Sequence, residues 1–172
     1  EGGMADTPVR AFLVAGARDA EALDAEPDVQ ARMWMTIGNA YSSLGEPHAS
    51  DSLLTLAVER YRSAGIRNLS YADALGSLGT TWSHLGRASE ATPLFVEAVA
   101  VAEADAAGAP SEALAVSTLQ LARHHFVLGD AGSAEPLYRR GLAMLLANDE
   151  VSTRIRARWL GRYGQFLWSQ GE

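Results

Sequence analysis

The chain has 172 residues, a formal net charge of −7 and 48% apolar residues, and it contains neither cysteine nor lysine. These absences exclude a disulfide framework, a cysteine–zinc site, a phosphate-loop lysine and a Schiff base. The acidic balance argues against nucleic acid as a partner, because binding to phosphate groups needs a broad basic face.

Four glycines, at positions 45, 86, 129 and 171, are separated by 41, 43 and 42 residues. A period of this size is typical of stacked helical repeats. Upstream of each glycine stand a large residue, an apolar one three positions later, a small one beside it, and a large one three further on. The four copies are Trp34, Ile37, Gly38 and Tyr41; Leu75, Leu78, Gly79 and Trp82; Thr118, Leu121, Ala122 and His125; and Leu160, Tyr163, Gly164 and Leu167.

A second motif of small, large and small residues follows the first three of these glycines. Its copies are Ser50, Leu54 and Ala57; Ala91, Phe95 and Ala98; and Ala134, Tyr138 and Gly141. Glycine at a helix end accepts the left-handed conformation that stops the helix. Glycine inside a helix lowers stability by roughly 1 kcal/mol relative to alanine. Gly38 and Gly79 therefore indicate that a paired helix crosses closely at those points.

The two motifs together resemble the tetratricopeptide repeat (TPR) in its long-period form, similar to kinesin light chain and many bacterial arrays. The resemblance covers roughly residues 8 to 171. It implies an all-α fold, a TPR-like α-solenoid in which antiparallel helix pairs wind into a right-handed superhelix. Thr118 and His125 depart from the family pattern, so we expect a looser third repeat.

We predict one domain over residues 1–172 with about eight helices: 8–25, 28–44, 48–64, 70–85, 88–107, 111–128, 131–147 and 152–170. The first, 8–25, is the second helix of a partial repeat. Full repeats follow at 31–64, 72–105 and 115–148, and residues 152–171 form the first helix of a further partial repeat. The array begins and ends in mid-repeat, so we expect it to be a piece of a longer protein.

Catalytic and metal-binding patterns are lacking in the sequence. Adjacent helical residues point about 100° apart, so His124 and His125 cannot share a metal ion, and we expect one ring in the aromatic position and its neighbour in solvent. We predict no catalytic residue, no metal and no cofactor in this chain. A kinase remains compatible as the parent protein. No apolar run approaches the roughly 18 residues of a membrane span, so no membrane insertion is predicted. The compartment stays open, with the cytoplasm favoured.

The family resemblance also implies which residues face the concave groove. These are Met35, Asn39 and Ser42 from the first copy; Gly76, Thr80 and Ser83 from the second; Leu119, Arg123 and Phe126 from the third; and Arg158, Arg162 and Gln165 from the fourth. The early groove is small and polar, with groups that hydrogen-bond a peptide backbone. The late groove is rich in arginine and favours an acidic, partly apolar partner.

The last helix carries a stripe of arginines and a group of aromatic residues, and both bear on binding. Arg154, Arg158 and Arg162 lie four residues apart on one stripe, which is either a binding face or a solvated face with Glu150 paired to Arg154. The helix also carries four aromatic residues, and an exposed aromatic patch there would favour self-association. These residues are Trp159, Tyr163, Phe166 and Trp168.

The predicted function is that of a protein–protein interaction module that binds a peptide or partner segment. Residues 11–38 resemble the start of TPR arrays attached to bacterial serine/threonine kinases, which implies a larger regulator as the parent. The alternative is the peptide- or ligand-sensing domain of a transcriptional regulator. A chaperone-binding carboxylate clamp is rejected, because only Asn39 matches its pattern, whereas Met35, Ser77, Val116 and Gln120 occupy the other positions.

Overall fold

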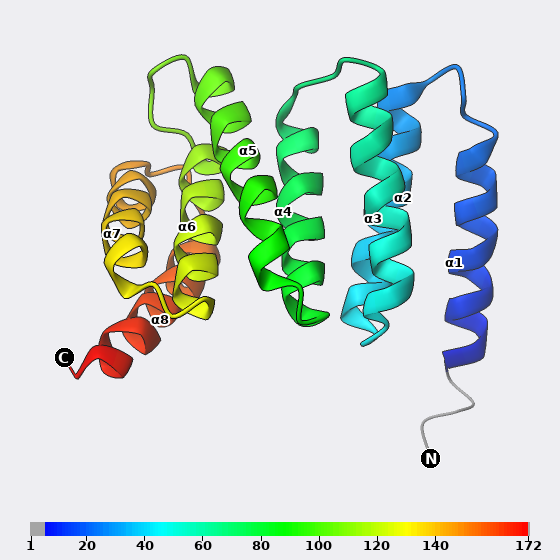
Figure 1. Ribbon diagram of the computed structural model, residues 1–172. Helices are drawn as coiled ribbons and strands as arrows, with labels where there is room; N and C mark the ends of the chain where they lie inside the picture. Colours follow the sequence, from blue (N-terminus) through cyan, green and yellow to red (C-terminus); the bar gives the residue numbers. More distant parts are fainter. Residues whose placement is uncertain (1–5, 172) are drawn as a thin grey trace.

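A computed structural model describes residues 6–171, which form eight α-helices joined by short turns (Figure 1). They are α1 (Asp6–Glu21), α2 (Pro27–Ser43), α3 (Pro47–Ser63), α4 (Leu69–His84), α5 (Ala88–Ala106), α6 (Glu112–Val127), α7 (Ala131–Ala147) and α8 (Thr153–Gln170). No strand occurs within this described part of the chain. The predicted all-α class is therefore confirmed.

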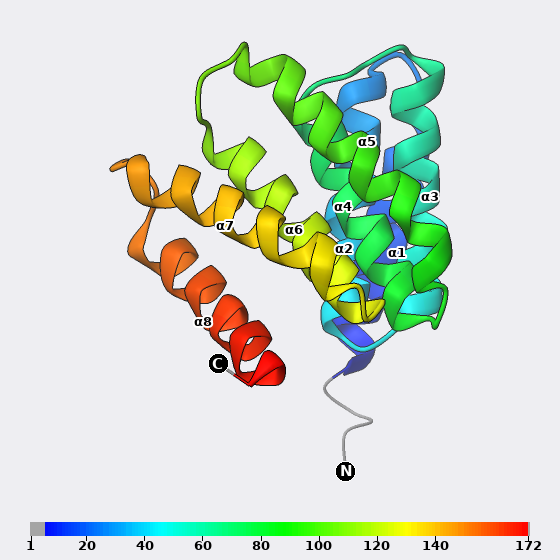
Figure 2. The same ribbon diagram turned by 60° about the vertical axis from the view of Figure 1, so that its left-hand side comes forward.

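The helices stack side by side in chain order as antiparallel pairs: α2 with α3, α4 with α5, and α6 with α7. Helices α1 and α8 stand at the two ends of the stack (Figure 1). Figure 2 shows that α7 and α8 run at a steep angle to α2 and α3, so each pair is rotated relative to the one before it. The array is thus a superhelix rather than a closed bundle, as a solenoid requires.

The helix ends follow local sequence signals. Gly45, Gly86 and Gly129 adopt positive φ values of 77°, 77° and 78° directly after α2, α4 and α6, as predicted. Side-chain oxygens of Asn68 and Ser111 accept hydrogen bonds from backbone N–H groups in the first turns of α4 and α6. These contacts satisfy amides that have no partner within the helix.

The first helix differs from its predicted range of 8–25, because α1 begins at Asp6 and ends at Glu21. The buried amide of Gln30 donates to the carbonyl oxygen of Ala20 at 2.9 Å and, more weakly, to that of Glu21 at 3.5 Å. The Gln30 side chain of α2 thereby gives a hydrogen bond to the last carbonyl groups of α1. A further helical turn would otherwise supply that bond.

The close helix crossings occur where the sequence predicted them. A Cβ atom placed on Gly38 would lie 2.9 Å from Cγ of Leu54, and one on Gly79 would lie 2.8 Å from Cε2 of Phe95. These distances are shorter than van der Waals contact, so only glycine lets the paired helices approach this far. In these two pairs, the large residue of the second motif packs on the small residue of the first.

The third repeat is not loose, contrary to expectation. Thr118 is fully buried, and its hydroxyl donates to the Leu114 carbonyl oxygen one turn earlier at 2.8 Å. The buried hydroxyl therefore has a partner, and the position packs without exposing a polar group. The buried residues form several clusters rather than one central one: the largest runs from α1 to α5, and another joins α6, α7 and α8.

None of the helices between residues 6 and 171 is long and apolar enough to cross a bilayer.

Candidate functional site

Two adjoining pockets lie between α6 and α8, one bounded also by α4 and the other by α7. One, of about 140 Å³, is lined by Thr80, Gln120, Arg123, Arg158, Trp159 and Arg162. The other, of about 220 Å³, is lined by Arg123, Phe126, Val127, Tyr138, Arg162 and Gln165. Arg123 and Arg162 belong to both pockets. We call the combined site the arginine hollow.

The arginine hollow carries positive charge that no carboxylate balances. Arg123, Arg158 and Arg162 have no ion-pair partner among residues 6–171. Elsewhere the chain pairs its arginines closely, as in Arg62–Glu97 at 2.6 Å and Arg140–Glu103 at 2.7 Å. An unbalanced group of guanidinium ions is a ready site for an anion.

Burial makes the charge of Arg123 less favourable in the free protein. Desolvation, and then repulsion from the Arg162 charge, lower the pKa of Arg123. Arg158 and Arg162 each place Cζ 5.6 Å from the centre of the Trp159 ring, within the range of cation–π attraction. The aromatic face holds the two side chains without neutralising them. A ligand carboxylate would therefore meet guanidinium groups that are held in place and free to donate.

The floor of the hollow is aromatic. Tyr138 is almost fully buried, and burial raises its pKa, although the nearby charges of Arg123 and Arg162 act in the opposite direction. The rings of Phe126 and Phe166 pack edge to face, with centres 5.5 Å apart. A partner segment with an apolar side chain next to its acidic group would match this combination of aromatic wall and basic rim.

Six of the predicted groove residues line the hollow: Thr80, Arg123, Phe126, Arg158, Arg162 and Gln165. Leu119 does not, because its side chain is fully buried against Gly141 of α7. That expectation was wrong, since glycine at position 141 leaves a notch that Leu119 fills. Gly76 is also buried, and it lies beneath the side chain of Gln120.

Four lining residues were absent from the predicted groove: Val127, Tyr138, Trp159 and Gln120. Of these, Gln120 had a sequence signal. It lies three positions before Arg123, and residues at this spacing share a helix face. Its amide reaches across from α6 to the bare backbone of Gly76 in α4. The spacing relative to Arg123 was the available signal.

The early groove offers fewer hydrogen-bond donors than predicted. The hydroxyls of Thr80 and Ser83 each donate at 2.9 Å to a carbonyl oxygen of their own helix, four residues back. Met35 packs against the buried cluster that contains Trp34 and Leu54. Neither Met35 nor Asn39, Ser42 or Ser83 lines the arginine hollow.

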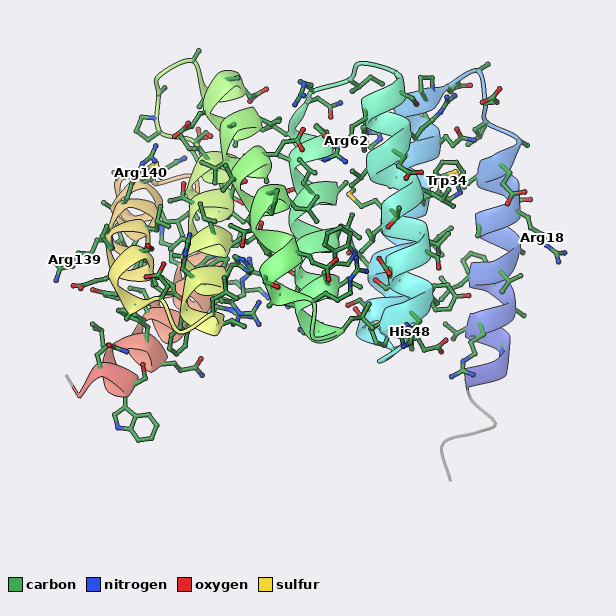
Figure 3. All side chains as sticks on the ribbon, in the orientation of Figure 1. Arg18, Trp34, His48, Arg62, Arg139 and Arg140 are labelled. Atoms are coloured by element: carbon green, nitrogen blue, oxygen red, sulfur yellow. The ribbon has the colours of Figure 1, made fainter. Side chains whose placement is uncertain are left out.

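The expected pair between Glu150 and Arg154 does not form. Asp149 instead lies 4.0 Å from Arg156, at the limit of an ion pair, and Arg154 has no carboxylate partner among residues 6–171. The solvated-face interpretation of the stripe therefore loses the contact on which it depended. Other arginines, such as Arg18 and Arg139, point outward from the stack (Figure 3).

The two adjacent histidines differ from the expected arrangement. His124 is the buried one, with its Nε2 2.9 Å from the Thr92 hydroxyl oxygen and its ring centre 4.7 Å from that of the tilted Phe95 ring. His125 is part-buried and pairs with Asp130 at 3.1 Å. No group of three or more potential metal ligands occurs within residues 6–171.

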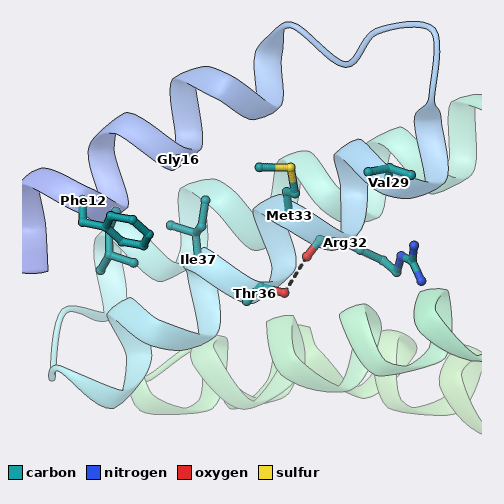
Figure 4. A pocket seen from close by; sticks show the side chains of 8 residues that line it. Phe12, Gly16, Val29, Arg32, Met33, Thr36 and Ile37 are labelled. Atoms are coloured by element: carbon teal, nitrogen blue, oxygen red, sulfur yellow. Dashed lines mark hydrogen bonds between the residues drawn. The ribbon is translucent and has the colours of Figure 1, made fainter.

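An apolar groove of about 300 Å³ lies at the opposite end of the stack, between α1 and α2 (Figure 4). Phe12 and Gly16 line it from α1, and Met33 and Ile37 line it from α2. The Arg32 guanidinium at its margin is 3.4 Å from the carboxylate of Asp28. This groove lacks the unbalanced charge of the arginine hollow.

Comparisons with known proteins agree with this architecture. Residues 72–104, covering most of α4 and α5, match the tetratricopeptide repeat family model. A search of curated proteins gave no significant match.

Solved structures with a similar fold include BtubC (BKLC) from P. vanneervenii, with a TM-score of 0.81, 15% identity, and coverage of 96% of this chain and 66% of that one. A putative kinesin light chain with TPR-like repeats from P. anserina has a TM-score of 0.73, 18% identity, and coverage of 85% and 69%. The TPR domain of Arabidopsis FLU has a TM-score of 0.60, 18% identity, and coverage of 70% and 99%. The chain thus spans about two thirds of the first two structures, and the likeness concerns the fold.

Proposed function

Because this chain is a TPR-like α-solenoid, a fold that serves as a protein–protein interaction module, we propose that its arginine hollow binds an acidic segment of a partner protein. The observation that carries the proposal is the group formed by Arg123, Arg158 and Arg162, which line one hollow and have no carboxylate partner among residues 6–171. Leaving three cations unbalanced is unfavourable for the free protein, and a bound carboxylate relieves it. The aromatic floor adds a preference for an apolar side chain beside the acidic one.

The partner segment is expected to lie across α4, α6 and α8, since these helices supply all the lining residues except Tyr138 of α7. Gln120 and Gln165 provide amide groups that pair with a peptide backbone, while the arginines hold the carboxylates through forked contacts. Burying a charged pair in such a hollow favours specificity, because a neutral segment would leave the guanidinium groups desolvated and unpaired.

We further propose that the array acts in the cytoplasm as part of a larger bacterial regulator such as a serine/threonine kinase. The support is the resemblance of residues 11–38 to the start of kinase-attached arrays. A catalytic lysine would have to lie outside these 172 residues, which contain none. An open reading frame without a kinase or other regulatory domain next to the array would contradict this part of the proposal.

The binding proposal is tested with an array of peptides that each carry two carboxylates and one aromatic side chain, against matched peptides in which Asn and Gln replace Asp and Glu. Fluorescence anisotropy on the wild type should show binding of the acidic set only. An Arg123→Ala, Arg162→Ala double variant should lose that binding.

Arg154→Ala serves as the matched control, because Arg154 lies on the same helix and is also unpaired, yet it does not line the hollow. Its affinity should stay close to that of the wild type. Equal binding of acidic and amide peptides, or equal losses in the two kinds of variant, would contradict the proposal.

A further inference from the structure

The two ends of the stack carry complementary halves of one helix pair. In two of the three complete pairs, a large residue of the second helix is buried on a small residue of the first: Leu54 on Gly38, and Phe95 on Gly79. The repeat register assigns the same two roles to Phe12 in α1 and to Gly164 in α8. Neither has its counterpart within residues 6–171.

The α1 half presents an unburied large residue. Phe12 is 78% exposed, whereas its equivalents Leu54, Phe95 and Tyr138 are at most 3% exposed. Phe12 also lines the apolar groove between α1 and α2 (Figure 4). In the complete repeats, the space beside a second helix and the following first helix is occupied by the paired first helix. The groove is therefore shaped for a helix of that kind.

The α8 half presents the matching notch. Nothing lies within 4 Å of a Cβ placed on Gly164, in contrast to Gly38 and Gly79. Leu160 is 44% exposed, although its equivalents Trp34 and Leu75 are 9% and 0% exposed. At 100° per residue, the face formed by Leu160, Gly164 and Leu167 lies opposite the face that lines the arginine hollow. Both faces of α8 are thus available at once.

Charge favours the same pairing. Helix α8 contains four arginines and no acidic residue. The end of α1 and the turn that follows it contain exposed carboxylates at Glu21, Asp24 and Glu26. In an antiparallel helix pair the first turn of α8, with its unpaired Arg154, would lie beside this acidic end of α1.

We propose that α8 of one copy docks into the α1–α2 groove of a second copy, with Phe12 of the second copy packed on Gly164 of the first. The contact continues the solenoid across two chains and reproduces the packing of Phe95 on Gly79. Because the two surfaces differ, the association is head to tail and adds further copies rather than closing as a two-fold dimer.

The test uses sedimentation equilibrium over a range of protein concentrations. The weight-average mass of the wild type should rise above the 18.3 kDa of one chain as concentration increases. Phe12→Glu and Gly164→Leu should each remain monomeric, with helical circular dichroism unchanged since both positions are exposed. Arg154→Glu should weaken the association and reduce its salt dependence.

Mixing the two blocked variants separates this model from other contacts. Phe12→Glu keeps an intact α8, and Gly164→Leu keeps an intact groove, so an equimolar mixture should reach twice the mass of one chain and stop there. Val96→Glu, a matched change at a 51% exposed apolar residue of α5, should associate like the wild type.

A wild type that stays monomeric at every concentration would overturn the proposal and leave the groove to a helix from outside this chain. So would a mixture that fails to form dimers. Association that disappears in Trp168→Ala but persists in Phe12→Glu would assign it instead to the 83% exposed Trp168.

Discussion

Leu119 of α6 packs directly onto the backbone of Gly141 in α7. A Cβ atom on residue 141 would lie 2.9 Å from Cδ2 of Leu119 and 3.1 Å from the carbonyl oxygen of Ala115, and it would meet Cγ of Leu119 even more closely. The carbonyl belongs to a helix backbone and cannot move aside. Gly141 therefore sets the distance between α6 and α7.

We expect Gly141→Ala to lower the free energy of unfolding by about 1–3 kcal/mol, the usual effect of overpacking a core. The intrinsic preference of helices for alanine, roughly 1 kcal/mol, only partly offsets the clash. Gly161→Ala is the control, because a Cβ there meets nothing within 4 Å. Urea denaturation of dilute protein should show the control stabilised and Gly141→Ala destabilised; two stabilised variants would contradict the close contact.

Glu97 joins three helices through one carboxylate. It accepts hydrogen bonds from Arg62 at 2.6 Å, from Arg67 at 3.0 Å and from the Tyr71 hydroxyl at 2.6 Å. Partial burial alone would raise the pKa of Glu97, but the bonds from Tyr71 and Arg62 outweigh it and lower the pKa. Glu97→Ala should destabilise the fold by about 1.5–3 kcal/mol. Glu103→Ala, which removes the exposed ion pair with Arg140, should lower the free energy of unfolding by less than about 1 kcal/mol.

The sign of the Glu97 pH dependence follows from its lowered pKa. The unfolded chain takes up a proton at a higher pH than the folded one, so the stability due to Glu97 is present above its ordinary pKa of 4.5 and is lost as the pH falls below it. Denaturation curves of wild type and Glu97→Ala should therefore converge on acidification. A constant difference would contradict the charge-assisted contact.

His124 should make the fold sensitive to mild acid. Its burial, and then the charge of His125, lower its pKa below the ordinary value of 6.5. Below that pH the unfolded chain binds a proton that folded His124 does not, so stability falls with pH, by at most about 1.4 kcal/mol per unit. Thermal unfolding between pH 7 and pH 5 should show a smaller slope for His124→Gln than for wild type. His125→Gln should reduce the slope less than His124→Gln does, because it removes only the smaller cause of the lowered pKa of His124.

Binding and stability should trade off in the arginine hollow. Arg162→Gln removes the like charge that acts on Arg123 and should raise the stability of the free chain, by about 1 kcal/mol or less because water screens both groups. The same variant should weaken acidic-peptide binding by about ten-fold or more, the value of a charge-assisted hydrogen bond. Calorimetry on free and peptide-bound protein measures both effects. A variant that loses stability and keeps affinity would contradict the proposed role.

Much of the fold was readable because its determinants are local and periodic. A glycine that stops a helix, such as Gly86, acts through its own backbone, and the small residue at Gly79 repeats at the same place in each copy. The end of α1 was misplaced because its carbonyl groups bond to Gln30, which lies in the next helix. A contact of that kind is not encoded in the sequence of the segment that it ends.

The groove was predicted less completely for the same reason. The family pattern assigned Arg123 and Arg162 to one groove, and both line the same pocket because they lie on regular faces of first helices. It failed at Leu119, because the direction of that side chain depends on the missing side chain of Gly141 in another helix. The lack of carboxylate partners around the arginines is likewise a property of three helices together, and only the structure shows it.

None of the hydrophobic clusters of residues 6–171 joins α1 to α8: the largest ends at α5, and another holds α6, α7 and α8 together. Because each repeat of a solenoid contacts only its neighbours, we expect a change of angle between two helix pairs to leave distant pairs intact. A segment bound between α4, α6 and α8 would bridge two boundaries between successive helix pairs and fix the angles there. Binding in the arginine hollow would then change the pitch of the superhelix, so that a local contact would move the two ends of the stack.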